Sequence, residues 1–304
     1  TMVSISSEVS PQMREYERFN TVSANAYVKP LIRSYLLRLK EKLYAKNIRC
    51  PIFLMHSGGG IISLESAAEF PVRLIESGPA GGAVFAATIA RKYNLKNTLS
   101  FDMGGTTAKI CLIKNQKPKT GRVFEVARSY RFKKGSGMPI SIPVIDMVEI
   151  GAGGGSLAHV DELQQIRVGP RSSGSYPGPA CYDLGGASPA VTDADLILGK
   201  LEENSFAGGS MKLNKSNSEK ALKSNIGHKL NISAELAAHG VSEVVDENMA
   251  NAARVHAVEN GEDLSDYTMI AFGGAAPLHA SRMCEKLGID TFLIPEGAGV
   301  GSAI

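Results

Sequence analysis

The sequence predicts an α/β protein with layered sheets, because short apolar strands alternate with helical segments along the chain. Two patterns carry this prediction. A strand–turn–strand segment at 99–113 encloses Asp102-Met-Gly-Gly-Thr-Thr107, and a strand at 268–272 ends in Gly273-Gly274 directly before a helix. Glycine that clusters at the ends of elements indicates loops that approach a ligand closely.

The composition is that of a globular chain with a substantial core. The 304 residues are 43% hydrophobic and 21% charged, with a net charge of +3. This near-neutral balance argues against a dedicated nucleic-acid-binding protein, although one basic cluster occurs at 131–134. No apolar run reaches the roughly 18 residues of a membrane span. The N-terminus lacks a signal-peptide pattern.

The four cysteines are far apart and show no CxxC or Cys/His spacing. This spacing argues against disulfides and a structural zinc, and a cytoplasmic location fits it. The chain starts at Thr1 and stops in the middle of a glycine-rich pattern. We therefore expect it to be part of a longer protein.

The first half of the chain begins with a polar stretch at 1–25, which we read as an extended lead-in. Leucine, isoleucine and tyrosine recur at helical spacing over 30–44 and predict an amphipathic helix. The elements expected next, in order, are a strand at 51–55, a helix at 63–70, a strand at 72–75 and an alanine-rich helix at 83–92.

The second half continues with strands at 121–127 and 140–150 after the hairpin. Residues 164–195 are rich in glycine, proline and serine and predict a long irregular segment. A helix at 194–202 follows, and the polar residues 203–230 suggest a surface excursion. The last expected elements are a helix at 232–258 with a candidate break at Gly240, a strand at 268–272, a helix at 277–287 and a strand at 291–294.

The hairpin turn has the chemistry of a phosphate-binding loop. Asp102, at the end of the first strand, can hold a hydrated Mg²⁺. Gly104 and Gly105 let backbone amides form an anion-binding nest, and the hydroxyls of Thr106 and Thr107 can meet phosphate oxygens. The alternative is an ordinary β-turn that uses these residues only for turn chemistry. From this motif alone the two interpretations are equally good.

A second glycine-rich loop, Gly151-Ala-Gly-Gly-Gly-Ser156, follows the strand at 142–148. It could be mistaken for a dinucleotide fingerprint, but its sixth position is serine and no acid-tipped strand follows about 20 residues later. We interpret it as a glycine floor near a substrate, with Asp146 close by. The candidate substrate-binding residues are Gly153, Gly154, Gly155 and Ser156.

Several other side chains have two interpretations. Asp193 and Asp195 could bind Mg²⁺, but Asp193 is equally well placed to cap a helix and Asp195 to compensate a helix dipole. Cys181 fits a small buried hydrophobe better than a nucleophile, because no partner can be assigned to it. His159 fits a surface or capping position, and His279 fits a packing role.

Together the motifs resemble the hydantoinase A/5-oxoprolinase family, and they occur in that family's order. They are Ser77-Gly-Pro-Ala-Gly-Gly82, Phe101-Asp-Met-Gly-Gly-Thr106, Val148-Glu-Ile-Gly-Ala-Gly-Gly-Gly-Ser156, Pro177-Gly-Pro-Ala-Cys-Tyr182, Val191-Thr-Asp-Ala-Asp195 and Ala271-Phe-Gly-Gly-Ala275. The sequence departs from the family pattern at Lys109, where an acid is usual, and at Val148-Glu149, where His-Thr is common.

The resemblance implies an actin-like (ribonuclease H-like) ATPase lobe with a loop-rich insertion. The implied segments are the end of a first lobe with its connecting helix (1–95), the phosphate-loop hairpin and the start of the second lobe (96–163), the insertion (164–231), and the adenosine-loop part (232–304). No second hairpin of this type occurs before residue 75. We therefore expect the first phosphate loop in a missing N-terminal lobe.

The implied function is ATP-dependent hydrolysis of a cyclic amide of the hydantoin or 5-oxoproline type through a phosphorylated intermediate. ATP and Mg²⁺ are the implied cofactors, with Asp102 and Asp146 as candidate catalytic residues. Gly104, Gly105, Thr106, Thr107, Gly273 and Gly274 would bind the nucleotide, and the metal candidates are Asp102, Asp193 and Asp195.

The expected partners are a cyclic amide or carbonyl substrate and a hydantoinase B-type subunit, with no nucleic acid and no membrane. The chain alone is expected to be inactive. The alternatives are an acetone-carboxylase-type subunit, a non-catalytic ATP-driven switch of the same fold, or a folded module that does not bind ATP by itself.

Overall fold

The computed structural model describes residues 2–129 and 135–303, so the basic cluster at 131–134 lies outside the described residues. The chain divides into two units. Unit 1 comprises Thr1–Thr88, Gln116–Asp146 and Ser302–Ile304, and unit 2 comprises Ile89–Asn115 and Met147–Gly301. Residues 116–146, which lie inside the predicted segment 96–163, therefore cluster with the N-terminal residues. Within the described part of the chain, no helix is long and apolar enough to cross a membrane.

Unit 1 combines helices with three two-stranded antiparallel sheets, in which β1 pairs with β2, β6 with β9 and β7 with β8. Small apolar clusters form its cores, around Leu36 and Leu64 in one case and around Val72, Ile140 and Ile142 in another. Its elements are α1 (Ser6–Val9), α2 (Glu15–Ala45), β1 (Phe53–Met55), β2 (Ile61–Ser63), α3 (Leu64–Glu69), a 3-10 helix (Pro71–Leu74), β5 (Lys117–Pro118), β6 (Thr120–Gly121), β7 (Phe124–Val126), β8 (Met138–Ile140) and β9 (Val144–Ile145).

Helix α2 begins at Glu15, so the expectation of an extended lead-in over 1–25 is wrong beyond that residue. The hydrophobic pattern fails there because the buried side of the helix is polar. Thr21, Asn25 and Lys29 are buried at four-residue spacing. Asn25 donates to the Glu69 carbonyl at 3.2 Å, Thr21 accepts from the Ser141 amide at 2.8 Å, and Lys29 pairs with Glu69. Hydrogen bonds of buried polar side chains thus fix this part of the helix together with the packing of Val22 and Ala24.

Two further predictions in this region differ from the structure. The apolar run 72–75 is a 3-10 helix, not a strand, and Pro71 occupies its first turn. Short apolar runs cannot be assigned by periodicity, and proline fixes a φ that suits a helix start. Helix α4 (Ser77–Lys92) begins six residues before the predicted 83, through the glycine-rich segment, and the boundary between the two units falls within it.

Unit 2 is built on a mixed sheet with the strand order β10-β4-β3-β13-β14. The predicted hairpin is confirmed: β3 pairs antiparallel with β4, and β10 adds on the other edge of β4. Strand β13 lies parallel to β3 and to β14. The strands are β3 (Asn97–Met103), β4 (Ala108–Lys114), β10 (Met147–Ile150), β13 (Thr268–Phe272) and β14 (Phe292–Leu293).

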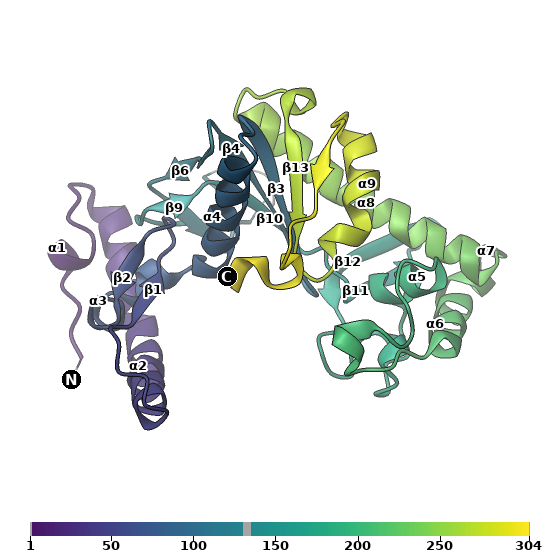
Figure 1. Ribbon diagram of the computed structural model, residues 1–304, viewed down its shortest axis with the longest axis horizontal. Coiled ribbons are helices and arrows are strands. Elements are labelled where there is room, and N and C mark those ends of the chain that lie inside the picture. The colour runs from purple at the N-terminus through teal and green to yellow at the C-terminus, as the bar shows by residue number, and fades with distance from the viewer. Residues whose placement is uncertain (1, 130–134, 304) are drawn as a thin grey trace. The chain divides into compact units, whose positions relative to one another are not determined.

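Helices α8 (Ala234–Glu259) and α9 (Ala276–Leu287) pack against this sheet, α8 on β10 and β4 and α9 on β13 and β3 (Figure 1). The candidate break at Gly240 does not occur, since α8 runs through it. A Cβ on Gly240 would lie 2.5 Å from Ile166 Cδ1. This glycine therefore serves close packing against a neighbouring strand rather than a kink.

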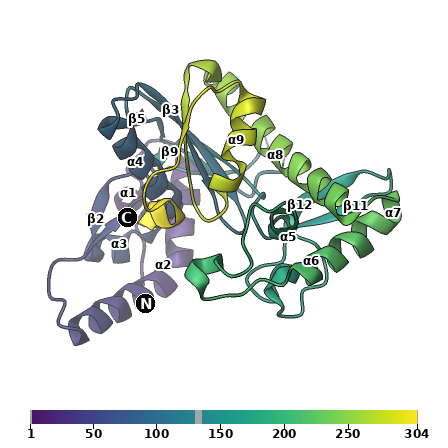
Figure 2. The same ribbon diagram turned by 45° about the vertical axis from the view of Figure 1, so that its right-hand side comes forward.

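The segment 164–231 is more regular than its composition suggests. Its elements gather beside the N-terminal half of α8 (Figure 2). Leu222 and Ile226 are buried within the stretch predicted as a polar surface excursion, because these few apolar residues pack onto the core. Beginning just before this segment, the elements are β11 (Ser156–Val160), β12 (Ile166–Ser172), 3-10 helices at Ala180–Tyr182 and Phe206–Gly209, α5 (Val191–Ile197), α6 (Lys215–Leu222), a π-helical turn (Lys223–Gly227) and α7 (His228–Leu230); a last 3-10 helix, Ala298–Ala303, closes the chain.

Candidate functional site

The hairpin loop and the turn after β13 lie at the same edge of the sheet. Strands β3 and β13 are parallel, and Phe272 pairs with Asp102. The loop at 104–107 and the Gly273-Gly274 turn therefore both start where these strands end. In α/β sheets, ligands bind at the carboxyl ends of parallel strands. The topology thus brings together two segments that are 165 or more residues apart.

The glycine loop at 151–155 packs directly on the hairpin loop. The Gly154 amide donates to the Gly104 carbonyl at 3.0 Å, and the Gly155 amide donates to the Gly105 carbonyl at 2.7 Å. A Cβ on Gly153 would lie 2.5 Å from the Thr106 nitrogen. Only glycine allows two backbones to come this close. The predicted substrate floor and the predicted phosphate loop are therefore neighbours.

Gly273 brings the third segment to the same place. Its φ is +92°, and a Cβ there would lie 2.5 Å from Asp102 Oδ1 and 2.6 Å from the Met103 carbonyl oxygen. The Ala275 amide donates to the Met103 carbonyl at 2.9 Å. The chain leaving β13 thus crosses the end of β3 beside the Asp102 carboxylate. All three glycine-rich segments singled out in the sequence meet at one edge of the unit 2 sheet.

A row of charged side chains runs across this edge. Asp102 pairs with Lys109 in the β3–β4 register, and Lys109 pairs with Glu149 between β4 and β10. Lys109 Nζ donates to Thr107 Oγ1 at 2.6 Å and lies 3.2 Å from Glu149 Oε1. Burial raises the pKa of Asp102, and the charge of Lys109 opposes that rise. The two positions that depart from the family pattern are therefore partners.

The donors at the loop suit an anion. Within the described residues, the amides of Gly105 and Thr106 donate no hydrogen bond. A Cβ on Gly104, Gly105 or Gly274 would meet nothing within 4 Å, so their surroundings are open. Mg²⁺ is commonly held by one or two carboxylates together with phosphate and water. Asp102 alone meets that need, and the residues therefore fit a metal–phosphate group.

The described residues contain no group of three or more His, Cys, Asp and Glu side chains arranged to hold a metal ion. Asp193 is fully buried, and its carboxylate accepts hydrogen bonds from four donors. These are the amides of Ala180, Cys181 and Ala190, at 2.8–3.0 Å, and the Ser218 hydroxyl at 2.7 Å. The N-cap of α5 is Ala190 and not Asp193, which lies in the first turn of the helix and caps it by accepting the Ala190 amide.

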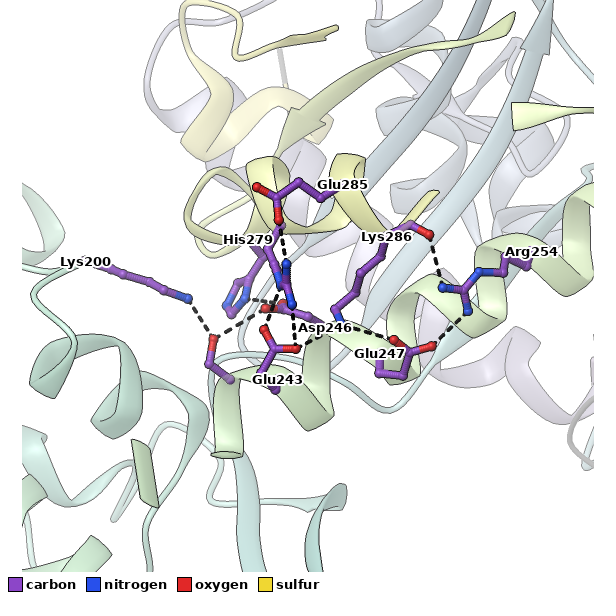
Figure 3. A network of polar contacts seen from close by, with 10 residues as sticks. Lys200, Glu243, Asp246, Glu247, Arg254, His279, Glu285 and Lys286 are labelled. Carbon is purple, nitrogen blue, oxygen red and sulfur yellow. Dashed lines mark hydrogen bonds and ion pairs between the residues drawn. The ribbon is translucent and has the colours of Figure 1, made fainter. Parts of the chain in front are cut away.

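Asp195 belongs to a buried cluster that links α5, α8 and α9. Its carboxylate lies 3.3 Å from His279 Nε2 and 3.1 Å from Lys200 Nζ. His279 Nδ1 lies 2.7 Å from Asp246 Oδ1, and Lys200 donates to Ser242 at 2.9 Å (Figure 3). Burial alone would lower the pKa of His279, but Asp195 and Asp246 outweigh it and raise the pKa to about 9. The imidazole is therefore a buried cation between two carboxylates.

A half-exposed ion-pair network continues along the same two helices (Figure 3). Glu243 on α8 accepts from Arg282 at 2.7 Å and from Lys286 at 3.0 Å, and Lys286 also reaches Glu247 at 3.1 Å. The Arg282 and Lys286 contacts lower the pKa of Glu243 to about 2. These pairs fix α9 against α8, and α9 begins directly after the Gly273-Gly274 turn.

The remaining candidates lie in different environments. Asp146 belongs to unit 1, where its amide donates to the Lys119 carbonyl at 2.8 Å. His159 is exposed on β11 opposite Arg167, as expected for a surface histidine. Cys181 is fully buried, and burial raises the pKa of its thiol, so it has the properties of a small hydrophobe. Sequence reasoning missed the Lys109–Glu149 and His279–Asp246 pairs, because only strand register and helix packing bring them together.

The chain is similar to several known proteins. Residues 18–304 match the hydantoinase/oxoprolinase family. An uncharacterized protein of Methanocaldococcus jannaschii is 43% identical over 98% of this chain and 44% of its own length. The caprolactamase subunit alpha of Pseudomonas jessenii is 37% identical over 96% of this chain and 40% of its own length.

The fold of the chain is also similar to that of a solved structure. The nucleotide-free acetone carboxylase structure superposes with a TM-score of 0.85 at 28% identity, over 98% of this chain and 41% of that one. The chain thus spans less than half the length of the relatives it matches. The mixed α/β fold predicted from the sequence is the fold of these proteins. The chain belongs to the hydantoinase/oxoprolinase family.

Proposed function

We propose that this chain supplies the second phosphate loop and the adenosine turn of an ATP-dependent enzyme that opens a cyclic amide. The observation that carries the proposal is the meeting of the Asp102 hairpin, the glycine loop at 151–155 and the Gly273 turn at one sheet edge. The similarity to caprolactamase supports a cyclic amide substrate. The acetone carboxylase structure, whose description names ATP-dependent carboxylation, supports the use of ATP.

In this proposal, the residues divide the work by their chemistry. Asp102 would hold Mg²⁺ or its water, while the amides of Gly105 and Thr106 and the hydroxyls of Thr106 and Thr107 would bind phosphate oxygens. Lys109 would neutralise charge beside them. Bound ATP would supply a transferable phosphoryl group to the amide oxygen, a reaction that depends on positioning and charge neutralisation.

The other candidate residues have subsidiary places in the same proposal. Gly274, with open space around it, would leave room for the adenosine beside Gly273. The glycine floor ending at Ser156 would lie under the substrate. Asp193 and Asp195 remain metal candidates only if a cation displaces their present partners. A first phosphate loop and a hydantoinase B-type subunit would complete the enzyme.

A carboxylase role is the second candidate, and the TM-score of 0.85 with acetone carboxylase favours it. Both candidates need ATP turnover that depends on a substrate, and a non-catalytic switch does not. The test measures ADP release by the intact protein with 5-oxoproline, hydantoins, caprolactam and acetone. Stimulation by a cyclic amide supports the leading proposal, and stimulation by acetone with bicarbonate supports the second.

The matched variants are Asp102→Asn and Asp290→Asn. Asp290 is an exposed carboxylate of the same unit and serves as the control. We expect Asp102→Asn to lower stimulated turnover by about 10²-fold, the usual effect of removing one electrostatic group at a reacting centre. Unchanged turnover in Asp102→Asn, or no stimulation by any of the compounds, would refute the proposal.

A further inference from the structure

Unit 1 contains a pocket that the proposed ATP site does not use. Its volume is about 800 Å³, within the range of small-molecule sites. It is enclosed by the turn after α1, the start of the β1–β2 connection, the 3-10 helix and the segment before β9. The lining includes Val9, Met13, His56, Ile62, Arg73 and Arg122.

The charged groups of this pocket are all basic. Arg73 and Arg122 line it, and among the described residues that line it none is Asp or Glu. Neither guanidinium forms an ion pair with any residue that the structure describes, although Arg73 stacks over the Phe70 ring at 4.9 Å. Arginine is the preferred side chain for binding planar carboxylates through two parallel hydrogen bonds. Two such groups without an acidic partner make an attractive site for an anion.

His56 adds a third potential donor to the lining. Its Nδ1 accepts a hydrogen bond from the Gly58 amide at 3.0 Å. In the neutral ring the proton is then on Nε2, which has no acceptor among the described residues. Burial, and then the charge of Arg73, lower the pKa of His56. The ring is therefore neutral near pH 7 in the free protein, and an anion bound beside it would favour its protonation.

Two buried hydroxyls at the same pocket lack partners. Ser10 and Ser141 are 2% and 4% exposed, and within the described residues the Oγ atom of each has no hydrogen-bond partner. Buried polar atoms are nearly always hydrogen-bonded in proteins, so each unmatched hydroxyl calls for an explanation. Both serines line the same pocket as Arg73 and Arg122, whose guanidinium groups form no ion pair with the described residues.

From these observations we propose that the pocket binds a small molecule with one carboxylate group and an apolar body. Arg73, Arg122 and His56 would hold the carboxylate. The apolar body would lie on the hydrophobic part of the lining, which includes Val9, Met13 and Ile62. A carboxylate is favoured over a phosphate because about half of the lining is apolar and guanidinium groups match a planar carboxylate.

The test measures binding of hexanoate to the intact protein by calorimetry, with hexanamide as the uncharged isostere and inorganic phosphate as the competing anion. The variants are Arg122→Gln, Arg73→Gln and the control Arg33→Gln, which removes an exposed arginine of the same unit. Arg122 is exposed and its side chain forms no hydrogen bond or ion pair with the residues that the structure describes, so its substitution should leave folding intact. We expect Arg122→Gln to weaken hexanoate binding by about 10-fold or more and Arg33→Gln to leave it unchanged.

Proton NMR of His56 gives a second readout, since hexanoate should raise the pKa of its imidazole and hexanamide should not. The proposal is overturned by any of three results. The first is that hexanoate does not bind at concentrations up to about 50 mM. The second is that hexanamide binds as tightly as hexanoate. The third is that Arg122→Gln leaves the affinity for hexanoate unchanged. Binding of phosphate without hexanoate likewise refutes a carboxylate site. None of these measurements requires ATP, so they leave the proposed phosphate loop untouched.

Discussion

Replacing Gly273 by alanine should distort the candidate site and destabilise unit 2, whereas the same change at Gly274 should not. At Gly273 the φ of +92° is unfavourable for any residue with a Cβ, and the new atom would lie 2.5 Å from Asp102 Oδ1. It would also lie 2.6 Å from the Met103 carbonyl oxygen, which already accepts the Ala275 amide. At Gly274 a Cβ would meet nothing within 4 Å.

The expected cost follows from two contributions. Strain of the backbone at positive φ costs about 1–2 kcal/mol, and forcing extra atoms into packed surroundings costs about 1–3 kcal/mol. Gly273→Ala should therefore lower the free energy of unfolding by roughly 2–5 kcal/mol, taking both contributions together. Gly274→Ala should stay within about 0.5 kcal/mol of the parent protein, as open positions usually do.

Urea unfolding followed by circular dichroism measures both variants under the same conditions. A loss of this size should move the midpoint of Gly273→Ala down by roughly 1 M urea. The midpoint of Gly274→Ala should match that of the parent. Equal midpoints for the two alanine variants would show that the close approach of the β13 turn to Asp102 is not a constraint, and would refute the site geometry described above.

Three other outcomes are expected. The pKa of His279 is about 9 in the folded protein, above its value in the unfolded chain. Its contribution to stability is therefore fully present below about pH 6.5 and is lost as the pH rises through 9. Urea titrations at several pH values should show this loss in the parent protein and not in His279→Gln. Gly153→Ala should disrupt the contact with Thr106 and cost about 1–3 kcal/mol in the same assay, whereas Gly299→Ala, where a Cβ meets nothing within 4 Å, should cost little. Lys109→Met should weaken ATP binding to the intact protein by about 10-fold in a filter-binding assay, and Glu149→Gln should not. An equal loss of ATP affinity in the two variants would show that the ion pair, rather than the lysine charge, matters.

Local sequence patterns predicted the centre of the unit 2 sheet and the two helices that pack on it. The β3–β4 hairpin, strand β13 and helices α8 and α9 follow directly from apolar runs, periodicity and terminal glycines. The errors fall where a few long-range contacts outweigh the local pattern. The N-terminal half of α2 buries Thr21, Asn25 and Lys29 through hydrogen bonds, so no hydrophobic period marks it. Residues 203–230 are mostly polar, yet Leu222 and Ile226 anchor their helical part to the core.

The candidate site likewise has features that the sequence determines and features that only the tertiary structure decides. Its residue types and their order along the chain are properties of the sequence, and they were sufficient to identify the family and the loop centred on Asp102. Only the tertiary structure decided that Gly153 and Gly273 both press against that loop, that Lys109 pairs with Glu149, and that Asp195 faces a buried histidine. The physical reason is that strand register and helix packing set these contacts between residues far apart in the chain, and local propensity carries no information about either.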